Sequence, residues 1–303
     1  MLHRLPFRAM GCEMLTIIEQ DTGKEPEILA QVPTWFEEWE QALSRFRYDS
    51  ELSRLNRTFD QPVSVSQTLW DVFQASLRAD QVTGGLVTPT VLDAVVMAGY
   101  DRPFDELPAN TGYLDMWTEI QPLSLVIYEE ENHSICLPPN VHLDFGGIAK
   151  GWAAHQTIEQ LKSTSPALMN AGGDIAISGP RLDGSRWPIG ISNLFEPSQN
   201  LLTLYLPGGG VATSGKDRRH WMQGALMNHH IIDPRTGQSA QTDILRATVV
   251  APTVMEAEAA VKSVFLLGSE AGLEWMEADP GLAGLLILDN GQMLTSSRLE
   301  EYL

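Results

Sequence analysis

Cysteine is scarce in this chain of 303 residues, which contains only Cys12 and Cys136. Neither belongs to a closely spaced cysteine pair, so the sequence excludes a disulfide-rich scaffold and a cysteine-based zinc or redox site. Basic residues are also few, because 20 lysines and arginines stand against 39 aspartates and glutamates, a formal net charge of −19. Such a surface repels phosphate backbones and anionic lipids, so we expect no nucleic-acid or membrane partner.

Long hydrophobic runs are missing as well, and no segment approaches the roughly 20 apolar residues of a transmembrane helix. The first residues, Met1 to Arg8, contain no apolar signal-peptide core. Low-complexity segments and internal repeats are also absent from the sequence. We therefore predict a globular protein without membrane insertion, located in the cytoplasm.

Helix-like and strand-like segments occur in groups along the chain. Four segments have the periodicity of helices: one after a capping box at Thr34 and Glu37, and 67–82, 256–267 and 271–277. Short strand-like segments lie at 15–19, 123–128, 133–137, 167–170, 175–178, 187–192, 201–206, 248–251 and 283–288. This grouping favours an α+β fold with mostly antiparallel sheets and flanking helices. Since no linker is visible, we expect residues 1–303 to form a single domain, in which two lobes could enclose a cleft.

The segment 144–151 reads Asp-Phe-Gly-Gly-Ile-Ala-Lys-Gly and lies between an apolar, strand-like run (134–143) and a predicted helix. Adjacent glycines let the backbone approach a ligand and aim free N–H groups at it, and the start of a helix adds partial positive charge. Lys150 would add a full charge. The motif suits an anionic group such as a pyrophosphate, although a plain strand-to-helix turn explains the same residues equally well.

Four further segments combine glycine with hydroxyl, carboxylate or imidazole groups: 83–90, 170–174, 212–215 and 230–237. In 212–215 we predict an anion-binding nest of backbone N–H groups, and in 230–237 we expect an Asp-Pro turn to orient a histidine. Each segment alone is typical of a turn, but their number favours a shared ligand site. The basic candidates for its charge are Lys150, Arg218, Arg219 and Lys262.

Taken in order, these motifs resemble those of the ApbE family, the FAD:protein FMN transferases. The resemblance extends from Met10-Gly11 to the Phe-Leu-Leu-Gly at 265–268 and is most specific at 144–151, 170–174, 213–215 and 230–237. It implies an enzyme that cleaves FAD, joins FMN by a phosphoester bond to a threonine or serine of an acceptor protein, and releases AMP. The acceptor would carry a flavinylation motif, in which an aspartate is followed three residues later by serine or threonine and then glycine.

Two alternatives stay open beside this function. One is an FAD-binding relative with little or no transferase activity, which acts as a carrier or regulator. The other is an FAD pyrophosphatase, which releases FMN and AMP without labelling a protein. All three bind FAD, so binding alone does not distinguish them.

The resemblance also implies roles for individual residues. Phe46 matches an aromatic residue that stacks on the isoalloxazine ring, although it could instead be the last core residue of its helix. His230 matches the catalytic histidine, and a neutral imidazole near pH 7 suits removal of a hydroxyl proton. The other FAD-binding positions are Met10, Asp144, Gly146, Gly147, Lys150, Asp174, Thr213, Ser214 and Gly215.

The metal site of the family is altered in this sequence. The resemblance implies Mg²⁺ at the pyrophosphate, bound by a backbone carbonyl that matches Ala149 and by an aspartate and a threonine one helical turn apart. Glu258 stands at the aspartate position and Lys262 at the threonine position. A protonated lysine repels a metal ion, and Mg²⁺ demands tight octahedral geometry. Either Lys262 replaces the ion and pairs with Glu258, or it bends away and Glu258 binds the ion; we favour weak or absent Mg²⁺ binding.

Overall fold

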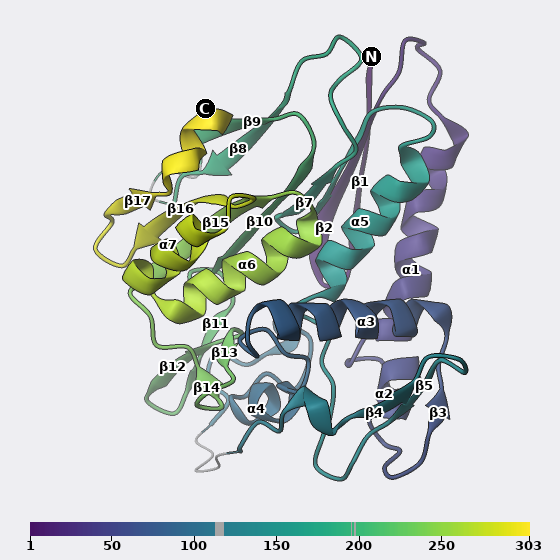
Figure 1. The fold of residues 1–303 in the computed structure, drawn as a ribbon, viewed down its shortest axis with the longest axis vertical. Helices are drawn as coiled ribbons and strands as arrows, with labels where there is room; N and C mark the ends of the chain where they lie inside the picture. The colour runs from purple at the N-terminus through teal and green to yellow at the C-terminus, as the bar shows by residue number, and fades with distance from the viewer. Residues whose placement is uncertain (113–117, 195, 197) are drawn as a thin grey trace.

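The structure is a computed structural model that describes residues 1–112, 118–194, 196 and 198–303. Its largest sheet has eight strands (Figure 1), in the spatial order β1 (Leu2–Ala9), β2 (Cys12–Glu19), β6 (Ala167–Ala171), β7 (Asp174–Ile177), β10 (Gly209–Gly215), β15 (Ile244–Ala251), β16 (Ala283–Leu288) and β17 (Met293–Thr295). All neighbouring pairs are antiparallel. The spatial order is also the chain order, so the sheet is a meander from which longer segments branch.

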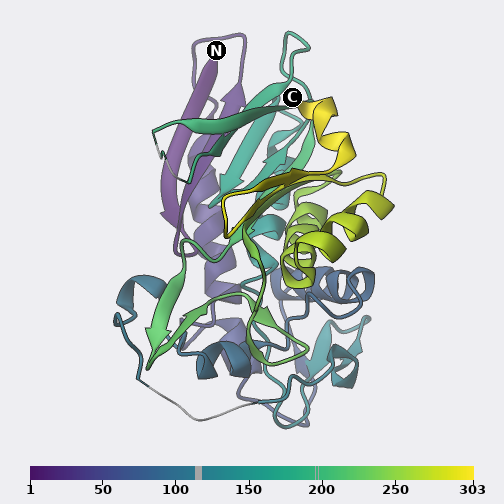
Figure 2. The same cartoon turned by 90° about the vertical axis from the view of Figure 1, so that its left-hand side faces the viewer.

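Helices cover one face of this sheet, where α5 (Ala149–Leu161), α6 (Val254–Leu267) and α7 (Ser269–Ala278) lie in front of the strands in Figure 1. The hairpin of β8 (Trp187–Ser192) and β9 (Asn200–Leu206) packs with the 3₁₀ helix η4 (Ser297–Tyr302) on the other face (Figure 2). Side chains of β7 alternate accordingly, with Ile175 and Ile177 in the cluster under the hairpin and Ala176 in the cluster under the helices.

The remaining elements branch from the sheet in two places. Between β2 and β6 lie η1 (Glu27–Gln31), α1 (Val32–Leu43), α2 (Glu51–Leu55), β3 (Val63–Ser64), α3 (Gln67–Val82), α4 (Leu92–Met97), η2 (Phe104–Glu106), η3 (Leu123–Leu125), β4 (Ile127–Glu129) and β5 (Ser134–Cys136). Between β10 and β15 lie two hairpins, β11 (His220–Gln223) with β12 (Leu226–His229), and β13 (Ile232–Asp233) with β14 (Gln238–Ser239). Helix α1 lies beside the large sheet in Figure 1, and most of the other elements form the part below it.

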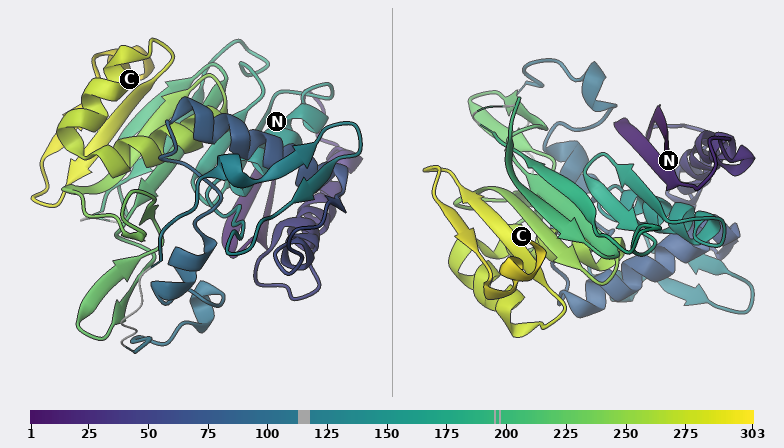
Figure 3. Two further views of the ribbon diagram at one scale, coloured as in Figure 1. Left: turned by 60° about the horizontal axis from the view of Figure 1, so that its bottom comes forward. Right: turned by 90° about the horizontal axis from the view of Figure 1, so that it is seen from above.

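The β11–β12 hairpin lies beside α4 and the chain that follows it (Figure 3). The indole Nε1 of Trp221 donates a hydrogen bond to the carbonyl oxygen of Ala98 at 2.7 Å, and its ring lies 5.4 Å from that of Tyr100. This packing fixes the chain on either side of the hairpin, including the two arginines that precede it and the histidine that follows it.

The predicted α+β fold with antiparallel sheets and flanking helices is confirmed, but the predicted capping box is wrong. Helix α1 begins at Val32 with Pro33 in its first turn, so Thr34 lies inside the helix and caps nothing. Glu37 instead pairs with Arg47. In the ranges that the structure describes, no helix is both long and apolar enough to cross a bilayer; the cytoplasmic location stays a prediction.

Candidate functional site

A cleft of about 930 Å³ opens at the end of the sheet that carries the β1–β2 and β6–β7 turns, between the sheet and the segments that branch from it. Its volume is in the range of small-molecule sites. Twelve of the fourteen residues that the sequence predicts for the site line it: Met10, Phe46, Asp144, Gly146, Gly147, Ala149, Lys150, Thr213, Ser214, Gly215, His230 and Lys262. Asp174 and Glu258 do not; both are buried directly behind the lysines.

An asparagine, rather than a strand, holds the chain that leads into the glycine loop. Asn56 Nδ2 donates to Leu143 O, and Leu143 N donates to Asn56 Oδ1, each at 2.8 Å. The side-chain amide of Asn56 thus makes the two backbone hydrogen bonds that a neighbouring strand would make. The next residue is held by a backbone hydrogen bond, in which Asp144 N donates to Pro89 O at 2.7 Å. The expectation that strand structure continues to 143 is wrong, because β5 ends at Cys136 and 141–143 has no strand partner in the described structure.

The glycine loop uses some of its N–H groups internally. Gly146 N donates to Asp144 Oδ1 at 2.7 Å, and Gly151 N donates to Glu258 Oε2 at 3.0 Å. The prediction that the loop and the first turn of α5 present free N–H groups to an anion is therefore wrong for these two residues. The positive charge on the cleft side comes from lysine side chains instead.

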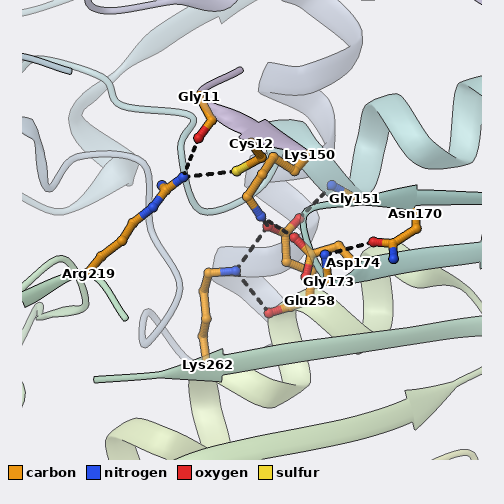
Figure 4. A network of polar contacts seen from close by, with 10 residues as sticks. All are labelled: Gly11, Cys12, Lys150, Gly151, Asn170, Gly173, Asp174, Arg219, Glu258 and Lys262. Atoms are coloured by element: carbon orange, nitrogen blue, oxygen red, sulfur yellow. Dashed lines mark hydrogen bonds and ion pairs between the residues drawn. The ribbon is translucent and has the colours of Figure 1, made fainter. Parts of the chain in front are cut away.

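Two lysines and two carboxylates meet where α5, β7 and α6 converge (Figure 4). Lys150 pairs with Asp174 and lies 3.3 Å from Glu258 Oε1, and the Nζ of Lys262 lies 3.1 Å from that same oxygen. Burial would lower the pKa of Lys150, but the negative charges of Asp174 and Glu258 outweigh it and raise the pKa above the usual value. Lys150 therefore carries its charge at neutral pH.

These residues do not fit a Mg²⁺ site. One oxygen of Glu258 contacts two ammonium groups, and the other accepts the Gly151 N–H. Mg²⁺ needs octahedral oxygen ligands, and ammonium groups cannot supply them. In the described part of the chain, no group of three or more histidine, cysteine, aspartate or glutamate side chains could hold a metal. The arrangement corresponds to the predicted Glu258–Lys262 pair.

His230 lies on the cleft wall between β12 and β13. Its Nδ1 is 3.4 Å from the carbonyl oxygen of Arg219, so the ring proton sits on Nδ1 and Nε2 stays free to accept one. Burial, together with the positive charge of Arg219, lowers the pKa of His230 to about 3. The imidazole is therefore neutral at physiological pH.

The residues on either side of His230 hold the backbone rather than face the cleft. His229 is buried, and its Nε2 donates to Ala240 O at 3.0 Å while its Nδ1 accepts from Ile231 N at 3.3 Å. Asp233 accepts from Arg235 N at 2.9 Å and pairs with the Arg235 guanidinium. This geometry agrees with the prediction that Asp233 fixes the turn.

Arg219 crosses the cleft to the β1–β2 turn. Its Nη2 donates to Gly11 O at 3.1 Å and lies 2.9 Å from Cys12 Sγ (Figure 4). Met10 and Gly11 both have positive φ, at 49° and 66°, as the tight two-residue turn requires. Met10 tolerates this conformation with its N–H bonded to Glu40 Oε2 at 2.8 Å. Because neither of these partners is a carboxylate, the charge of Arg219 remains available to an anion in the cleft.

Phe46 is an exposed ring on the cleft wall, not a core residue. Helix α1 ends at Leu43, and Phe46 is 39% exposed. The guanidinium of Arg45 lies 4.0 Å from the centre of the Phe46 ring and 4.7 Å from that of Tyr100. Arg45 Nε pairs with Asp144 Oδ2 at 3.1 Å, whereas its Nη2 is buried without a hydrogen-bond partner in the described structure.

The predicted anion-binding nest at 212–215 is wrong. These residues end strand β10, where they pair in register with β15, and the Thr213 hydroxyl lies 2.9 Å from that of Thr248. They still line the cleft, because β7, the other neighbour of β10, pairs only with Gly209–Val211. Thr213 and Ser214 therefore reach the site from the end of a strand.

Several site residues were not singled out from the sequence: Arg45, Asn56, Tyr100 and Arg246. Arg246 pairs with Asp217 and lies 3.0 Å from Ser192 Oγ on the cleft wall. Arg45 and Asn56 belong to the charged segment 44–56 that also contains Phe46, but nothing in that segment indicates their partners. Tyr100 and Arg246 lie in segments without any motif.

Comparison with known proteins gives a consistent result. A sequence model of the ApbE family matches residues 10–286. The FAD:protein FMN transferase of Haemophilus influenzae is 30% identical over 84% of this chain and 77% of its own length, and that of Escherichia coli is 25% identical over 89% and 79%.

Solved structures share the fold at low sequence identity. An ApbE protein from Thermotoga maritima has a TM-score of 0.87 at 22% identity, covering 100% of this chain and 99% of its own. The flavin transferase ApbE from Vibrio cholerae has a TM-score of 0.82 at 23% identity, with the same coverage of both chains. The extent of the family match and the identity to the Haemophilus influenzae relative show that this chain belongs to the ApbE family.

Proposed function

We propose that the protein is an FAD:protein FMN transferase, which cleaves FAD, attaches FMN to an acceptor protein and releases AMP. Membership of the ApbE family and the relatives named FAD:protein FMN transferase support this function. The observation that carries it is a single cleft lined by an exposed aromatic ring, two lysines and a neutral histidine. These groups suit a flavin ring, a diphosphate and a hydroxyl proton, respectively.

In this proposal FAD lies along the cleft. The isoalloxazine ring stacks on the exposed ring of Phe46. The diphosphate lies over the glycine loop between Lys150 and Lys262. Thr213 borders the same region from the end of β10.

His230 acts as the general base. The acceptor hydroxyl gives its proton to Nε2 as its oxygen attacks the phosphorus of the FMN half. The new phosphorus–oxygen bond forms while the bond to the bridging oxygen breaks, and AMP leaves with that oxygen. The nearby lysines and Arg219 stabilise the charge that develops on the phosphate oxygens.

The test incubates the protein with FAD and a protein that carries the flavinylation motif, followed by in-gel flavin fluorescence. We expect a fluorescent acceptor and an equal amount of AMP. His230→Ala should still bind FAD but lose labelling by about two orders of magnitude or more, the usual contribution of a general base. His3→Ala is the matched control, because His3 lies on the edge strand β1 and does not line the cleft.

Other outcomes distinguish the alternatives. Release of FMN and AMP without a labelled acceptor would identify an FAD pyrophosphatase. FAD binding without turnover would identify a carrier or regulator. Normal labelling by His230→Ala would show that another group is the base.

We also infer that residues 1–303 form one functional domain. Strands from both ends of the chain join the same sheet, and the cleft is lined by residues from Met10 to Leu266. A fragment that ends before β15 would lose Lys262 and three strands of the sheet.

A further inference from the structure

We propose that two ammonium groups, those of Lys150 and Lys262, replace a divalent metal ion at the diphosphate of FAD, so that binding and transfer do not depend on Mg²⁺. The inference rests on the proposed function, since it concerns how the same ligand is held. It follows from the positions of four charged side chains, which differ from those of a metal site.

The first observation is which charges reach the cleft. The side chains of Asp174 and Glu258 are 3% and 2% exposed and do not line it. Lys150 and Lys262, 19% and 16% exposed, do. A ligand beside the glycine loop therefore meets two lysine side chains, whereas the two carboxylates that these lysines contact are out of its reach.

The second observation is that Glu258 has no free oxygen. Its Oε1 lies 3.1 Å from Lys262 Nζ and 3.3 Å from Lys150 Nζ, and its Oε2 accepts the N–H of Gly151 at 3.0 Å. A metal ion on Glu258 would approach both ammonium groups closely, and like charges at such separations repel strongly in a partly buried site. A metal ion can bind only if both lysines move.

The third observation is the direction of the Lys262 side chain. Its stem passes along the glycine loop, where a Cβ on Gly147 would lie 3.4 Å from Lys262 Cε. Its Nζ also donates to the carbonyl oxygen of Glu258 at 3.3 Å. Lys262 therefore does not bend away from the site, as the metal-bound alternative requires. Together, the two lysines supply the same formal charge as one divalent ion.

The first experiment uses the unmodified protein. FAD affinity is measured by flavin fluorescence in EDTA and in excess MgCl₂, and acceptor labelling is followed under both conditions. We expect the dissociation constant and the labelling rate to change by less than about threefold, far below the effect of losing a required ion. A tenfold or larger gain with Mg²⁺ in either quantity would overturn the proposal.

The second experiment removes one ammonium group. In EDTA, Lys262→Met should weaken FAD binding by about tenfold, as expected for the loss of a charge-assisted contact. The matched control is Lys162→Met, because Lys162 pairs with Glu159 at the end of α5 and does not line the cleft. Thermal melting checks that each variant is folded. Equal FAD affinity of folded Lys262→Met and unmodified protein would contradict the assigned role.

The third experiment restores the metal ligands that the resemblance implies. The double variant Glu258→Asp with Lys262→Thr should bind FAD more tightly in MgCl₂ than in EDTA, whereas the unmodified protein should not. A double variant without Mg²⁺ dependence would count against the replacement. Failure of the unmodified protein to bind FAD under any condition would overturn the proposed function, and this inference with it. FAD binding and labelling that require Mg²⁺ would overturn this inference alone.

Discussion

The chemical state of His230 comes from its surroundings rather than from its neighbours in sequence. Arg219 supplies both the carbonyl that fixes the ring proton on Nδ1 and a positive charge that opposes a second proton. A pKa of about 3 makes a base that is always neutral but accepts a proton only weakly. A bound diphosphate favours the imidazolium, so we expect FAD to raise the pKa of His230 towards neutrality.

The low pKa of His230 predicts how stability depends on pH. The unfolded chain takes up a proton near its ordinary pKa of about 6.5, whereas folded His230 does not until the pH approaches its lowered pKa. Stability should therefore fall on acidification, by at most about 1.4 kcal/mol per pH unit for this group. The pKa values of His155 and His229, both lowered by burial, act in the same direction.

Urea unfolding between pH 7 and pH 5 measures this effect. His230→Gln should reduce the slope of stability against pH. An unaltered slope in His230→Gln would mean that His230 keeps an ordinary pKa in the folded protein.

Lys150 and His230 could be predicted from the sequence because each belongs to a short motif whose chemistry is local. Arg45 and Asn56 could not, because their roles depend on partners far along the chain. Asn56, for example, bonds Leu143 across 87 positions, and nothing near either residue indicates the pairing. The sequence therefore points to Lys150 and His230, which line the cleft, but gives no sign of the asparagine that holds the glycine loop in place.

At the level of elements, the site depends on how closely α5 and α6 approach each other. Gly151 is the contact point, because a Cβ there would lie 2.5 Å from Glu258 Oε2. Gly151 also donates its N–H to that oxygen. A side chain at this position would separate the helices and displace the carboxylate that holds both lysines.

Gly151→Ala should therefore destabilise the protein by about 1–3 kcal/mol, as overpacking of a buried contact does, and should also weaken FAD binding. Gly272→Ala is the matched control: its Cβ would lie 2.6 Å from Val264 O, at the α6–α7 contact outside the cleft. It should lower stability without a change in FAD affinity. Urea unfolding measures the stability of each variant, and flavin fluorescence measures its FAD affinity. If Gly151→Ala and Gly272→Ala lost FAD affinity equally, the local role of Gly151 would be contradicted.

The sequence predicts elements well where periodicity is strong, as in α3, whose bounds Gln67–Val82 it predicts without error. It fails for β10, whose glycines are more typical of a turn. Those glycines serve packing, since a Cβ on Gly210 would clash with the backbone at Val254, where α6 begins. The contact with α6, and not the local sequence, explains the glycines of this strand. The prediction of an anion-binding nest at 212–215 was therefore wrong.

At the level of the whole molecule, the cleft joins segments that are not adjacent in the chain. The β1–β2 turn, the loop after α1, the glycine loop, the end of β10 and His230 all contribute to its wall. A ligand that spans the cleft must therefore stabilise the folded chain as a unit. A ligand that corresponds to only half of FAD should stabilise the folded chain less.

FAD at a hundredfold excess over its dissociation constant should stabilise the protein by about 2.7 kcal/mol, seen as a rise in melting temperature. AMP or riboflavin alone should give smaller shifts at equal concentration, because each contacts only part of the cleft. A riboflavin shift equal to that of FAD would mean that the diphosphate contacts contribute nothing to binding.

The meander order of the large sheet also has a consequence for divergence within the family. Each segment that branches from the sheet leaves one strand and returns on the strand beside it. The β11–β12 hairpin at the rim, for instance, could be lengthened, shortened or exchanged without any change in the strand order of the sheet. A change in this hairpin can therefore alter the rim while Lys150, Asp174, Glu258 and Lys262 keep their places, because these four residues lie on α5, β7 and α6.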